Sequence, residues 1–255
     1  MRGKKIWLIG ASEGIGKCLA EALAKEGAML AVSARQADKL DALAQTISAL
    51  ALPADVQNMS SLASAYEALR RTWGMPDIVI YNAGYYEPMT AQQFNLAEAE
   101  KMQDINFNGC MRMLSHVLPD FIKGNKGHLV LVGSIAAYRG LPGAIGYGAS
   151  KAALLHLAEN LAVDLYGSGV KVQVVSPGFV RTRLTAKNNF HMPGIIEPER
   201  AAREIISGMK GNAFEIRFPF VFPTVLRWLS FLPAKLYFAI VRDGQSKPVI
   251  ESKHT

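Results

Sequence analysis

Three polar side chains near the middle of the sequence have types and a spacing that suit the interconversion of a carbonyl and an alcohol. Tyr147 lies four residues before Lys151, and residues i and i+4 of a helix share a face. Ser134 follows an apolar run, and the glycine-rich loop after it can bring its hydroxyl opposite that face. A phenol has a pKa of about 10, and a neighbouring ammonium group favours its ionised form. We therefore expect Tyr147 to exchange a proton with a substrate oxygen held by Ser134.

Such a Tyr-x-x-x-Lys pair is also common on solvent-exposed helices, so the rest of the chain must support it. A glycine-rich turn gives the first support, because the apolar run 5–9 ends at Gly10 and a helical pattern covers 17–26. Glycines let a backbone approach a pyrophosphate closely, and a helix N-terminus favours negative charge. We expect a dinucleotide to contact Gly10, Ser12, Glu13, Gly14, Ile15 and Gly16. The alternative is a glycine-rich turn that binds no ligand.

The end of the second expected strand, 28–33, indicates which dinucleotide binds. An acidic residue at this place would hold a ribose 2′-hydroxyl, but the sequence has Ala34 and then Arg35. A guanidinium group suits a 2′-phosphate, so we expect NADP(H) rather than NAD(H). Glu13 in the glycine turn argues mildly against a phosphate, and Arg35 could instead be a solvated surface residue.

Further strand ends carry residues that could reach the same ligand, because the carboxyl ends of parallel strands border the ligand crevice. They are Asp55 and Val56 after the strand 50–53, Asn82, Ala83 and Gly84 after the strand 77–81, and Pro177, Gly178, Val180 and Thr182 after the strand 170–175. Asp55 could accept a hydrogen bond from adenine or only cap a turn. Asn82 could fix the backbone near the cofactor or be a plain turn residue. The last group is placed to close over a nicotinamide.

Helical patterns alternate with apolar runs along most of the chain, without repeats or low-complexity linkers. The expected strands cover 5–9, 28–33, 50–53, 77–81, 128–133, 170–175 and 212–218, and the expected helices cover 17–26, 38–48, 60–72, 98–123, 147–166 and 198–209. This alternation predicts an α/β fold with a parallel sheet covered by helices on both faces. We expect residues 1–218 to form one catalytic domain, followed by an apolar and basic C-terminal extension over 219–255.

Composition and charge argue against several classes of protein. The net charge is +7, but residues 181–255 hold 12 Lys/Arg against 6 Asp/Glu, so the excess is local and predicts no nucleic-acid partner. Cys18 and Cys110 fit buried thiols in a reducing compartment better than a disulfide or a metal pair, and we expect no metal. No run of about twenty apolar residues predicts a membrane span, and the apolar run after the basic start is too short for a signal peptide. We expect a cytoplasmic protein, with membrane association left open.

Taken together, these residues resemble the classical short-chain dehydrogenases/reductases over about residues 4–215. The resemblance is carried by Gly10, Gly14 and Gly16, by Asp55, by Asn82, Ala83 and Gly84, by Asn106, by Ser134, Tyr147 and Lys151, and by Pro177, Gly178 and Thr182. It implies a three-layer Rossmann fold with a doubly wound parallel sheet of seven strands, and hydride transfer to or from a nicotinamide cofactor. Ile9 before Gly10 replaces the threonine that is frequent in the family, which is a mild departure.

The resemblance also implies a role for each polar residue. Tyr147 would be the general acid/base, Ser134 would position the substrate carbonyl, and Lys151 would bind the nicotinamide ribose and tune Tyr147. Arg35 would contact the 2′-phosphate, and Thr182 would contact the nicotinamide carboxamide.

Asn106 lies in the middle of the helical pattern over 98–123. Asparagine is a mediocre helix former whose side chain competes with the backbone for hydrogen bonds. Buried there it needs a partner, which could be another protein group or a water. The resemblance implies that Asn106 holds a water of a proton relay.

The chain departs from the family pattern after the last expected strand. Residues 185–197 take the place of a mobile substrate loop, in which His191 could touch substrate or simply be exposed. The segment 219–242 is rich in Phe, Leu, Trp and Pro, with short amphipathic helices expected at 224–231 and 234–242. It could pack on its own core or on another subunit, lie on a membrane surface, or wall an apolar substrate pocket. The last two interpretations favour a lipophilic substrate.

These observations predict an NADP(H)-dependent oxidoreductase that interconverts a carbonyl and an alcohol of a small molecule, with a lipophilic substrate left open. We also expect a homo-oligomer, either a dimer or a tetramer. The alternative is a non-catalytic NADP(H)-binding regulatory protein, or a membrane-surface protein, built on the same fold. The complete set of Asn106, Ser134, Tyr147 and Lys151 argues against a sensor, because a sensor needs no general acid.

Overall fold

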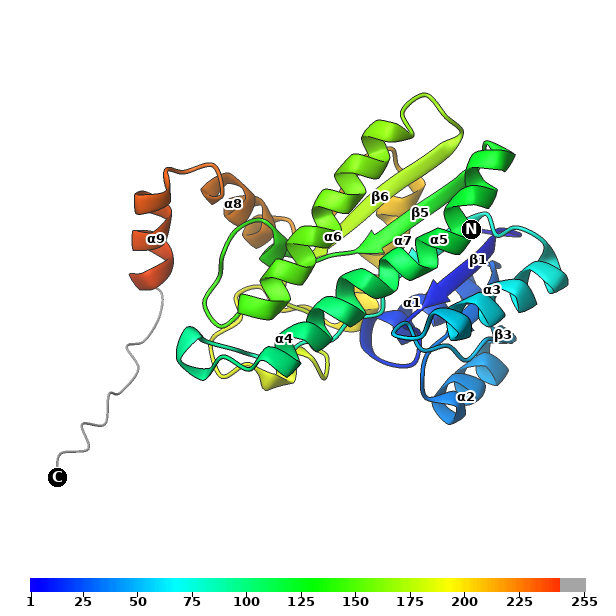
Figure 1. Cartoon of the computed structure of the whole chain (residues 1–255), viewed down its shortest axis with the longest axis horizontal. Coiled ribbons are helices and arrows are strands. Elements are labelled where there is room, and N and C mark those ends of the chain that lie inside the picture. The colour runs from blue at the N-terminus through cyan, green and yellow to red at the C-terminus, as the bar shows by residue number, and fades with distance from the viewer. Residues whose placement is uncertain (244–255) are drawn as a thin grey trace.

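The apolar runs form strands and the amphipathic stretches form helices in a computed structural model that describes residues 1–243 (Figure 1). The strands are β1 (Lys5–Ile9), β2 (Met29–Ser33), β3 (Leu50–Ala51), β4 (Ile78–Tyr81), β5 (Gly127–Val132), β6 (Val170–Pro177) and β7 (Glu215–Phe218). The helices are α1 (Gly14–Lys25), α2 (Ala37–Ile47), α3 (Met59–Trp73), α4 (Leu96–Gln103), α5 (Gly109–Gly124), α6 (Ile145–Asp164), α7 (Pro198–Lys210), α8 (Val221–Leu229) and α9 (Ala234–Asp243).

All seven strands lie in one parallel sheet in the order β3-β2-β1-β4-β5-β6-β7, which confirms the predicted doubly wound fold. Ile6 of β1 pairs with Leu30 on one side and with Ile78 on the other. The strand order reverses between β1 and β4, so the carboxyl ends of these strands open a crevice of the kind that binds ligands. The sheet therefore places the glycine turn after β1 beside the Asn82 loop after β4.

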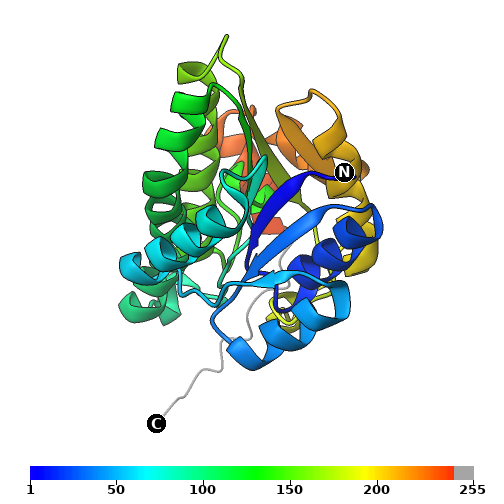
Figure 2. The same ribbon diagram turned by 90° about the vertical axis from the view of Figure 1, so that its right-hand side faces the viewer.

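Side chains alternate between the two faces of the sheet and build a separate core on each. Trp7 and Ile9 of β1 join the core under α3, α5 and α6, whereas Ile6 and Leu8 join the core under α1, α2 and α7. Figure 2 shows the sheet edge-on between these two helical layers. Because helices cover both faces, β4 is buried throughout and β6 nearly throughout, as is typical of parallel sheets.

The helical pattern over 98–123 is not one regular helix, because a π-helical turn over Asp104–Asn108 separates α4 from α5. Gly109 donates its backbone N–H to the carbonyl of Asp104, five residues back. The carbonyl of Ile105, four residues before Gly109, instead accepts a 2.5 Å hydrogen bond from the hydroxyl of Tyr81. Only glycine fits at position 109, since a Cβ atom there would lie 2.3 Å from that hydroxyl. A buried tyrosine of β4 thus fixes the wide turn that carries Asn106.

Two expected strands are shorter in the structure than the apolar runs suggested. The run 50–53 forms a strand only over Leu50–Ala51, and the run 212–218 only over Glu215–Phe218. Pro53 has no N–H to give to a neighbouring strand, which is one reason for the early end of β3.

The C-terminal extension begins with α8 and α9, and the structure describes it as far as residue 243. Pro223, Leu226 and Tyr237 are its buried side chains, and Tyr237 donates a 2.9 Å hydrogen bond to the carbonyl of Gly140. Figure 1 shows the two helices at the end of the molecule toward which β5 points. Within the described residues, the helices are all too short or too polar to cross a bilayer.

Candidate active site

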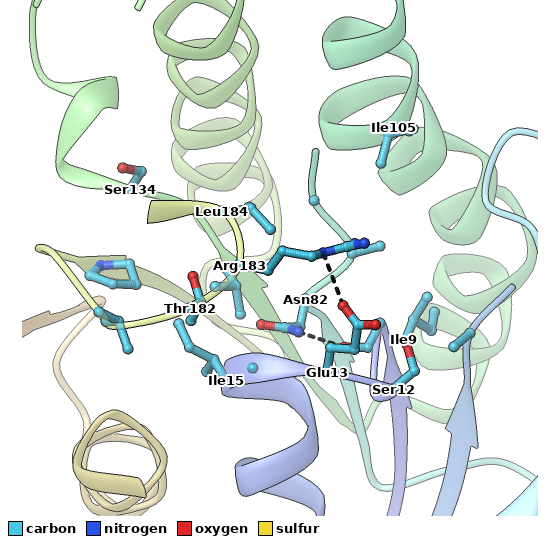
Figure 3. A pocket seen from close by; sticks show the side chains of 18 of the residues that line it. Ile9, Ser12, Glu13, Ile15, Asn82, Ile105, Ser134, Thr182, Arg183 and Leu184 are labelled. Atoms are coloured by element: carbon cyan, nitrogen blue, oxygen red, sulfur yellow. Dashed lines mark hydrogen bonds and ion pairs between the residues drawn. The ribbon is translucent and has the colours of Figure 1, made fainter. Parts of the chain in front are cut away.

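A cleft runs along the carboxyl ends of β1, β2, β4, β5 and β6, and most of the predicted residues line it (Figure 3). From the predicted set, the lining contains Gly10, Ser12, Glu13, Gly14, Ile15, Arg35, Val56, Asn82, Ala83, Gly84, Ser134, Tyr147, Lys151, Pro177, Gly178, Val180 and Thr182. Residues that were not predicted to contact a ligand complete it: Ile9, Ala34, Ala54, Ile105, Val132, Gly133, Arg183, Leu184 and Thr185. The cleft therefore joins the glycine turn to the Ser134–Tyr147–Lys151 group.

The glycine turn fits a dinucleotide because its glycines bring the backbone close to the cleft. Gly10 has φ +89°, and a Cβ atom there would lie 2.5 Å from the backbone nitrogen of Ala83. The side-chain amide of Asn82 donates a 2.7 Å hydrogen bond to the carbonyl of Gly10, so the two strand ends hold each other (Figure 3). Gly14, with φ +54°, begins α1 and leaves the N-terminus of that helix facing the cleft. This cradle offers N–H groups and a helix dipole to a phosphate group.

Three of the predicted residues lie just outside the cleft lining. Gly16 packs beneath the turn, where a Cβ atom would lie 2.0 Å from the carbonyl oxygen of Gly10. The carboxylate of Asp55 accepts a 3.0 Å hydrogen bond from the backbone N–H of Gln57, which is the turn-capping geometry. The third residue is Asn106.

Asn106 is fully buried, and its side chain holds the loop after β4 against α6. Its Oδ1 accepts from the backbone N–H of Tyr85 at 2.7 Å, and its Nδ2 donates to the Tyr85 carbonyl at 3.0 Å and to Ser150 Oγ at 2.8 Å. Both amide protons are therefore engaged by protein groups. A water relay through Asn106 would have to use the remaining lone pair of Oδ1 or the backbone.

Charged side chains cross the outer end of the cleft. The carboxylate of Glu13 accepts from Lys39 Nζ at 2.5 Å and pairs with Arg183 Nε at 3.1 Å, as Figure 3 shows for Arg183. The hydrogen bond from Lys39 is the main cause that lowers the pKa of Glu13, and the charge of Arg183 adds to it. Arg35 lines the same end and is exposed. No sequence pattern marked Arg183; its position directly after Thr182 was the sole indication.

At the inner end, Ser134 and Tyr147 face each other as predicted. Ser134 caps the short helical turn after β5, where its Oγ accepts a 3.1 Å hydrogen bond from the N–H of Ala136. Burial raises the pKa of Tyr147 to about 12, which the hydrogen bond from Ser134 partly opposes and the neighbouring Tyr86 reinforces. Tyr147 is therefore a neutral phenol at neutral pH, with the Ser134 hydroxyl beside it.

Lys151 does not lower the pKa of Tyr147 in this structure, which corrects the expectation of an acidified phenol. Its side chain is 3% exposed, and Nζ donates to the carbonyl of Val132 at 2.9 Å. Nζ lies 5.8 Å from the centre of the Tyr147 ring. Burial lowers the pKa of Lys151 to about 8, because the charged ammonium is poorly solvated there. Lys151 does line the cleft together with Tyr147, so the predicted helical face is correct.

Aromatic side chains lie beside Tyr147 and on the loop after β6. The ring of Tyr86 lies 4.9 Å from that of Tyr147, centre to centre, and its hydroxyl donates to Asn188 Oδ1 at 2.8 Å. Phe179 stacks on Phe222 of α8 at 5.7 Å and meets Phe190 edge-on at 5.8 Å. The loop after β6 and the extension thus form one apolar wall near the cleft.

The segment from Val180 to Thr185 is held by hydrogen bonds among its own residues. The hydroxyl of Thr185 accepts from the N–H of Thr182 at 2.9 Å and donates to the carbonyl of Val180 at 2.6 Å. His191, further along, is exposed. This bonding places Thr182 and Thr185 on the cleft side of the loop, where both line it.

Comparison with known protein sequences gives a family and several relatives. The model of the short chain dehydrogenase family matches residues 4–192. An uncharacterized oxidoreductase of Myxococcus xanthus is 36% identical over 238 residues, which cover 91% of this chain and 94% of that protein. Ketoacyl reductase HetN of Nostoc sp. is 30% identical over 225 residues, which cover 85% of this chain and 78% of that protein.

Solved structures show the same fold. An alcohol dehydrogenase from the archaeon Thermococcus sibiricus, complexed with 5-hydroxy-NADP, matches with a TM-score of 0.79 at 24% identity over 87% of this chain and 98% of that chain. A protein described as a short chain dehydrogenase/reductase family protein matches with a TM-score of 0.75 at 26% identity over 85% and 95% of the two chains. The chain therefore belongs to the classical short-chain dehydrogenase/reductase family and is an oxidoreductase of that family.

Proposed function

We propose that this protein is an NADP(H)-dependent oxidoreductase that interconverts a carbonyl and an alcohol, with Tyr147 as its general acid/base. One observation carries the proposal. A single cleft has a backbone cradle for phosphates at one end and the side chains of Ser134, Tyr147 and Lys151 at the other. A dinucleotide extended along it would bring its nicotinamide to those three side chains.

Ser134, Tyr147 and Lys151 at the inner end have separate roles in the reaction. The bound nicotinamide supplies or accepts the hydride at the substrate carbon. The hydroxyl of Ser134 holds the substrate oxygen, and the phenol of Tyr147 donates its proton to that oxygen in the reductive direction. A raised pKa keeps Tyr147 protonated at neutral pH, which favours its use as an acid. Lys151, which lines the same end of the cleft, would hold the nicotinamide ribose.

The preference for NADP(H) rests on the outer end of the cleft. Arg35 follows β2, where a carboxylate would be needed to hold a ribose 2′-hydroxyl, and it lines the cleft. Its guanidinium group can bind a 2′-phosphate through two parallel hydrogen bonds. Lys39 also lies at this end, where its ammonium group is paired with the carboxylate of Glu13.

The substrate side of the cleft supports a lipophilic carbonyl compound. The ring of Tyr86 offers an apolar contact beside the catalytic phenol. The aromatic wall of Phe179, Phe190 and Phe222 adjoins the cleft, because Gly178 and Val180 on either side of Phe179 line it. The Nostoc relative is named a ketoacyl reductase, which agrees with a carbonyl on an acyl chain. We therefore expect turnover to increase from small ketones to long-chain 3-keto compounds when NADPH oxidation is followed across such a panel.

The substitution Tyr147→Phe tests the catalytic assignment. It removes one hydroxyl, so NADPH binding measured by fluorescence should stay the same while the turnover number falls by at least about a hundredfold, the contribution of a general acid. Tyr166→Phe is the matched control, because Tyr166 lies just after α6 and its side chain is 92% exposed. Turnover of Tyr147→Phe near that of the unchanged protein would overturn the assignment.

The same measurements separate the enzyme from a non-catalytic NADP(H)-binding protein. A sensor would bind NADPH but would oxidise it with none of the carbonyl compounds, whether or not Tyr147 is present. In that case Tyr147→Phe would leave the rate of NADPH oxidation unchanged, because there would be no catalysis to remove.

We also propose that the protein is a homo-oligomer. The outward side of α5 carries Met111 and Ile122 in exposed positions, and a shallow apolar hollow lies between them. Leu114, Leu118 and Leu161 also line this hollow. An apolar helix surface of this kind is suited to a second copy, and sedimentation velocity of the purified protein would measure the assembly.

A further inference from the structure

The C-terminal extension presents a row of large apolar side chains to solvent. We call these residues the outer apolar face: Phe220, Val221, Val225, Trp228, Phe231, Leu236, Phe238 and Ile240. Their side chains are between 44% and 75% exposed, with Phe220 the most exposed of them. Soluble surfaces carry single apolar residues, but so many within two short helices mark an interaction site.

The fold holds this face outward. Leu226 of α8 and Tyr237 of α9 are buried on the opposite side, where Tyr237 bonds to Gly140. Arg139 donates to the carbonyls of Ser230 at 3.0 Å and Leu232 at 2.6 Å, which ties the turn between the helices to the body of the protein. The orientation of the outer apolar face is therefore set by contacts with the core.

Basic residues outnumber acidic ones beside the outer apolar face, where Asp243 at the end of α9 is the one carboxylate of the two helices. From residue 216 to 242 the sequence contains Arg217, Arg227, Lys235 and Arg242 but no aspartate or glutamate. The guanidinium group of Arg227 lies 5.5 Å from the centre of the Phe231 ring, and Lys235 is exposed in the first turn of α9. Apolar helices with a tryptophan and basic side chains are suited to the interface of a membrane with anionic lipids.

A second copy of the chain fits this face less well. In a twofold interface the same patch lies on both partners, so the basic residues would meet each other with too few carboxylates to offset them. The outward side of α5, described above, is a separate apolar surface that is available for self-association. Charge complementarity thus favours an anionic lipid surface over another protomer.

We propose that the outer apolar face docks the protein on an anionic lipid bilayer. Trp228 and Phe231 enter the headgroup region, and Arg227 and Lys235 lie at the level of the lipid phosphates. Phe222 of α8 stacks on Phe179 of the loop after β6, so the docked helices adjoin the wall of the cleft. Docking does not depend on the catalytic assignment, because it uses none of the cleft residues.

Vesicle co-sedimentation of the full-length protein tests this inference. The protein should pellet with vesicles of phosphatidylcholine mixed with phosphatidylglycerol, and much less of it should pellet with vesicles of phosphatidylcholine alone. Added salt should weaken the binding to the anionic vesicles. The double substitution Trp228→Ser with Phe231→Ser should lower the partition coefficient by at least about tenfold, because two aromatic side chains no longer leave water. Lys235→Gln should lower it by about fivefold on the anionic vesicles only.

The matched control removes equally exposed aromatic residues from other surfaces. Phe94→Ser with Tyr166→Ser changes side chains that are 55% and 92% exposed, and it should leave vesicle binding unchanged. A blue shift of the Trp228 emission on vesicle addition would support insertion of α8, and the shift should be lost in Trp228→Ser.

Three results would overturn the inference. The protein could fail to pellet with anionic vesicles, or both double variants could bind equally well. Alternatively, sedimentation velocity without lipid could show that the protein is an oligomer, that Trp228→Ser with Phe231→Ser dissociates it, and that the control double variant does not. That result would assign the outer apolar face to a second copy of the chain. Vesicle co-sedimentation does not depend on turnover. A protein that fails to bind vesicles could still be the proposed enzyme, and a protein without catalytic activity could still bind vesicles.

Discussion

Glu13 places a carboxylate at the end of the cleft where a bound dinucleotide would bring its phosphates. Lys39 and Arg183 hold that carboxylate, at 2.5 Å and 3.1 Å between nitrogen and oxygen atoms. A phosphate that enters the cleft must therefore compete with Glu13 for both cations. Arg35, exposed at the same end, is free of any ion pair among the described residues.

The charges at this end predict opposite effects of two substitutions on NADPH affinity. Glu13→Gln should lower the dissociation constant of NADPH by about two- to fivefold, since it releases two partly exposed cations. Arg35→Ala should raise it by about tenfold or more and leave NADH nearly unaffected, because the guanidinium group would contact only the 2′-phosphate. Glu21→Gln, about two turns further along α1, is the control. Equal losses for NADPH and NADH would count against Arg35 as the phosphate ligand.

Lys151 is a buried cation, and the burial of its charge lowers the stability of the folded state. Below pH 8 the lysine is protonated in both the folded and the unfolded chain, so the full penalty of burying its charge applies. Between about pH 8 and the ordinary value of 10.5, the unfolded chain binds more protons, and the stability of the folded state rises with pH.

We therefore expect Lys151→Met to raise the free energy of unfolding at pH 7 by about 1–3 kcal/mol while it abolishes turnover. The advantage should shrink as the pH increases from 8 toward 10. Urea unfolding at several pH values measures both effects, with Lys123→Met on the exposed side of α5 as the control. An unchanged or lower stability at pH 7 would show that the hydrogen bond to Val132 outweighs the desolvation.

At the scale of elements, the break between α4 and α5 shows how one strand shapes a helix on top of it. Tyr81 at the end of β4 takes the Ile105 carbonyl away from Gly109, and the wide turn that results brings Asn106 toward the loop after β4. The side chain of Asn106 then bonds to both backbone groups of Tyr85. Strand, helix and loop are joined through one buried amide.

Asn106→Ala should lower the free energy of unfolding by about 2–4 kcal/mol. The substitution leaves the N–H and C=O of Tyr85 without their partner, and buried polar groups are costly when unpaired. It also removes a donor to the hydroxyl of Ser150, which keeps its hydrogen bond to the Tyr147 carbonyl. Asn108→Ala is the control, because the only hydrogen bond of its amide, among those of the described residues, is a long one of 3.4 Å to Asp104. Denaturant titration of both variants gives the comparison, and equal losses would refute the special role of Asn106.

Much of this site could be predicted from sequence because local rules govern it. The turn at Gly10 depends on residue type within one strand–helix unit, and the common face of Tyr147 and Lys151 depends on helical period. The π-helical turn could not be predicted, since it depends on a contact between Tyr81 and Ile105, which are far apart in the sequence.

The charges in the cleft were missed for the same reason. The pairing of Glu13 with Arg183 joins residues that are far apart in the sequence, and the direction of Lys151 Nζ depends on the carbonyl of Val132 on another element. The pKa of Tyr147 follows from burial, which no spacing of residues reveals. Such long-range contacts are decided by the packed fold and not by the local pattern.

At the scale of the whole molecule, a parallel sheet covered on both faces buries polar groups that happen to lie on its strands. His128 of β5 is one of them, with a side chain that is 9% exposed. Burial lowers its pKa to about 4, and the nearby charge of Lys171 acts in the same direction. Between pH 6.5 and 4 the unfolded chain therefore binds a proton that the folded chain does not, and stability falls as the pH falls.

We expect acid to destabilise the protein by up to about 3 kcal/mol through His128 over that range. His128→Gln, which cannot titrate, should flatten the decline, whereas His156→Gln on an exposed part of α6 should not. Thermal or urea unfolding between pH 7 and 4 measures the slope. Parallel curves for the unchanged protein and His128→Gln would show that other groups cause the acid sensitivity.

The segment that separates Ser134 from Tyr147 is supported from outside by the extension. Tyr237 bonds to Gly140, Arg139 bonds to the turn after α8, and the guanidinium group of Arg227 lies over the ring of Tyr138. A recombinant form shortened at residue 218 would remove every one of these braces at once. Kinetic constants measured on such a shortened form would describe a different catalyst, so screening and crystallisation should keep α8 and α9 in place.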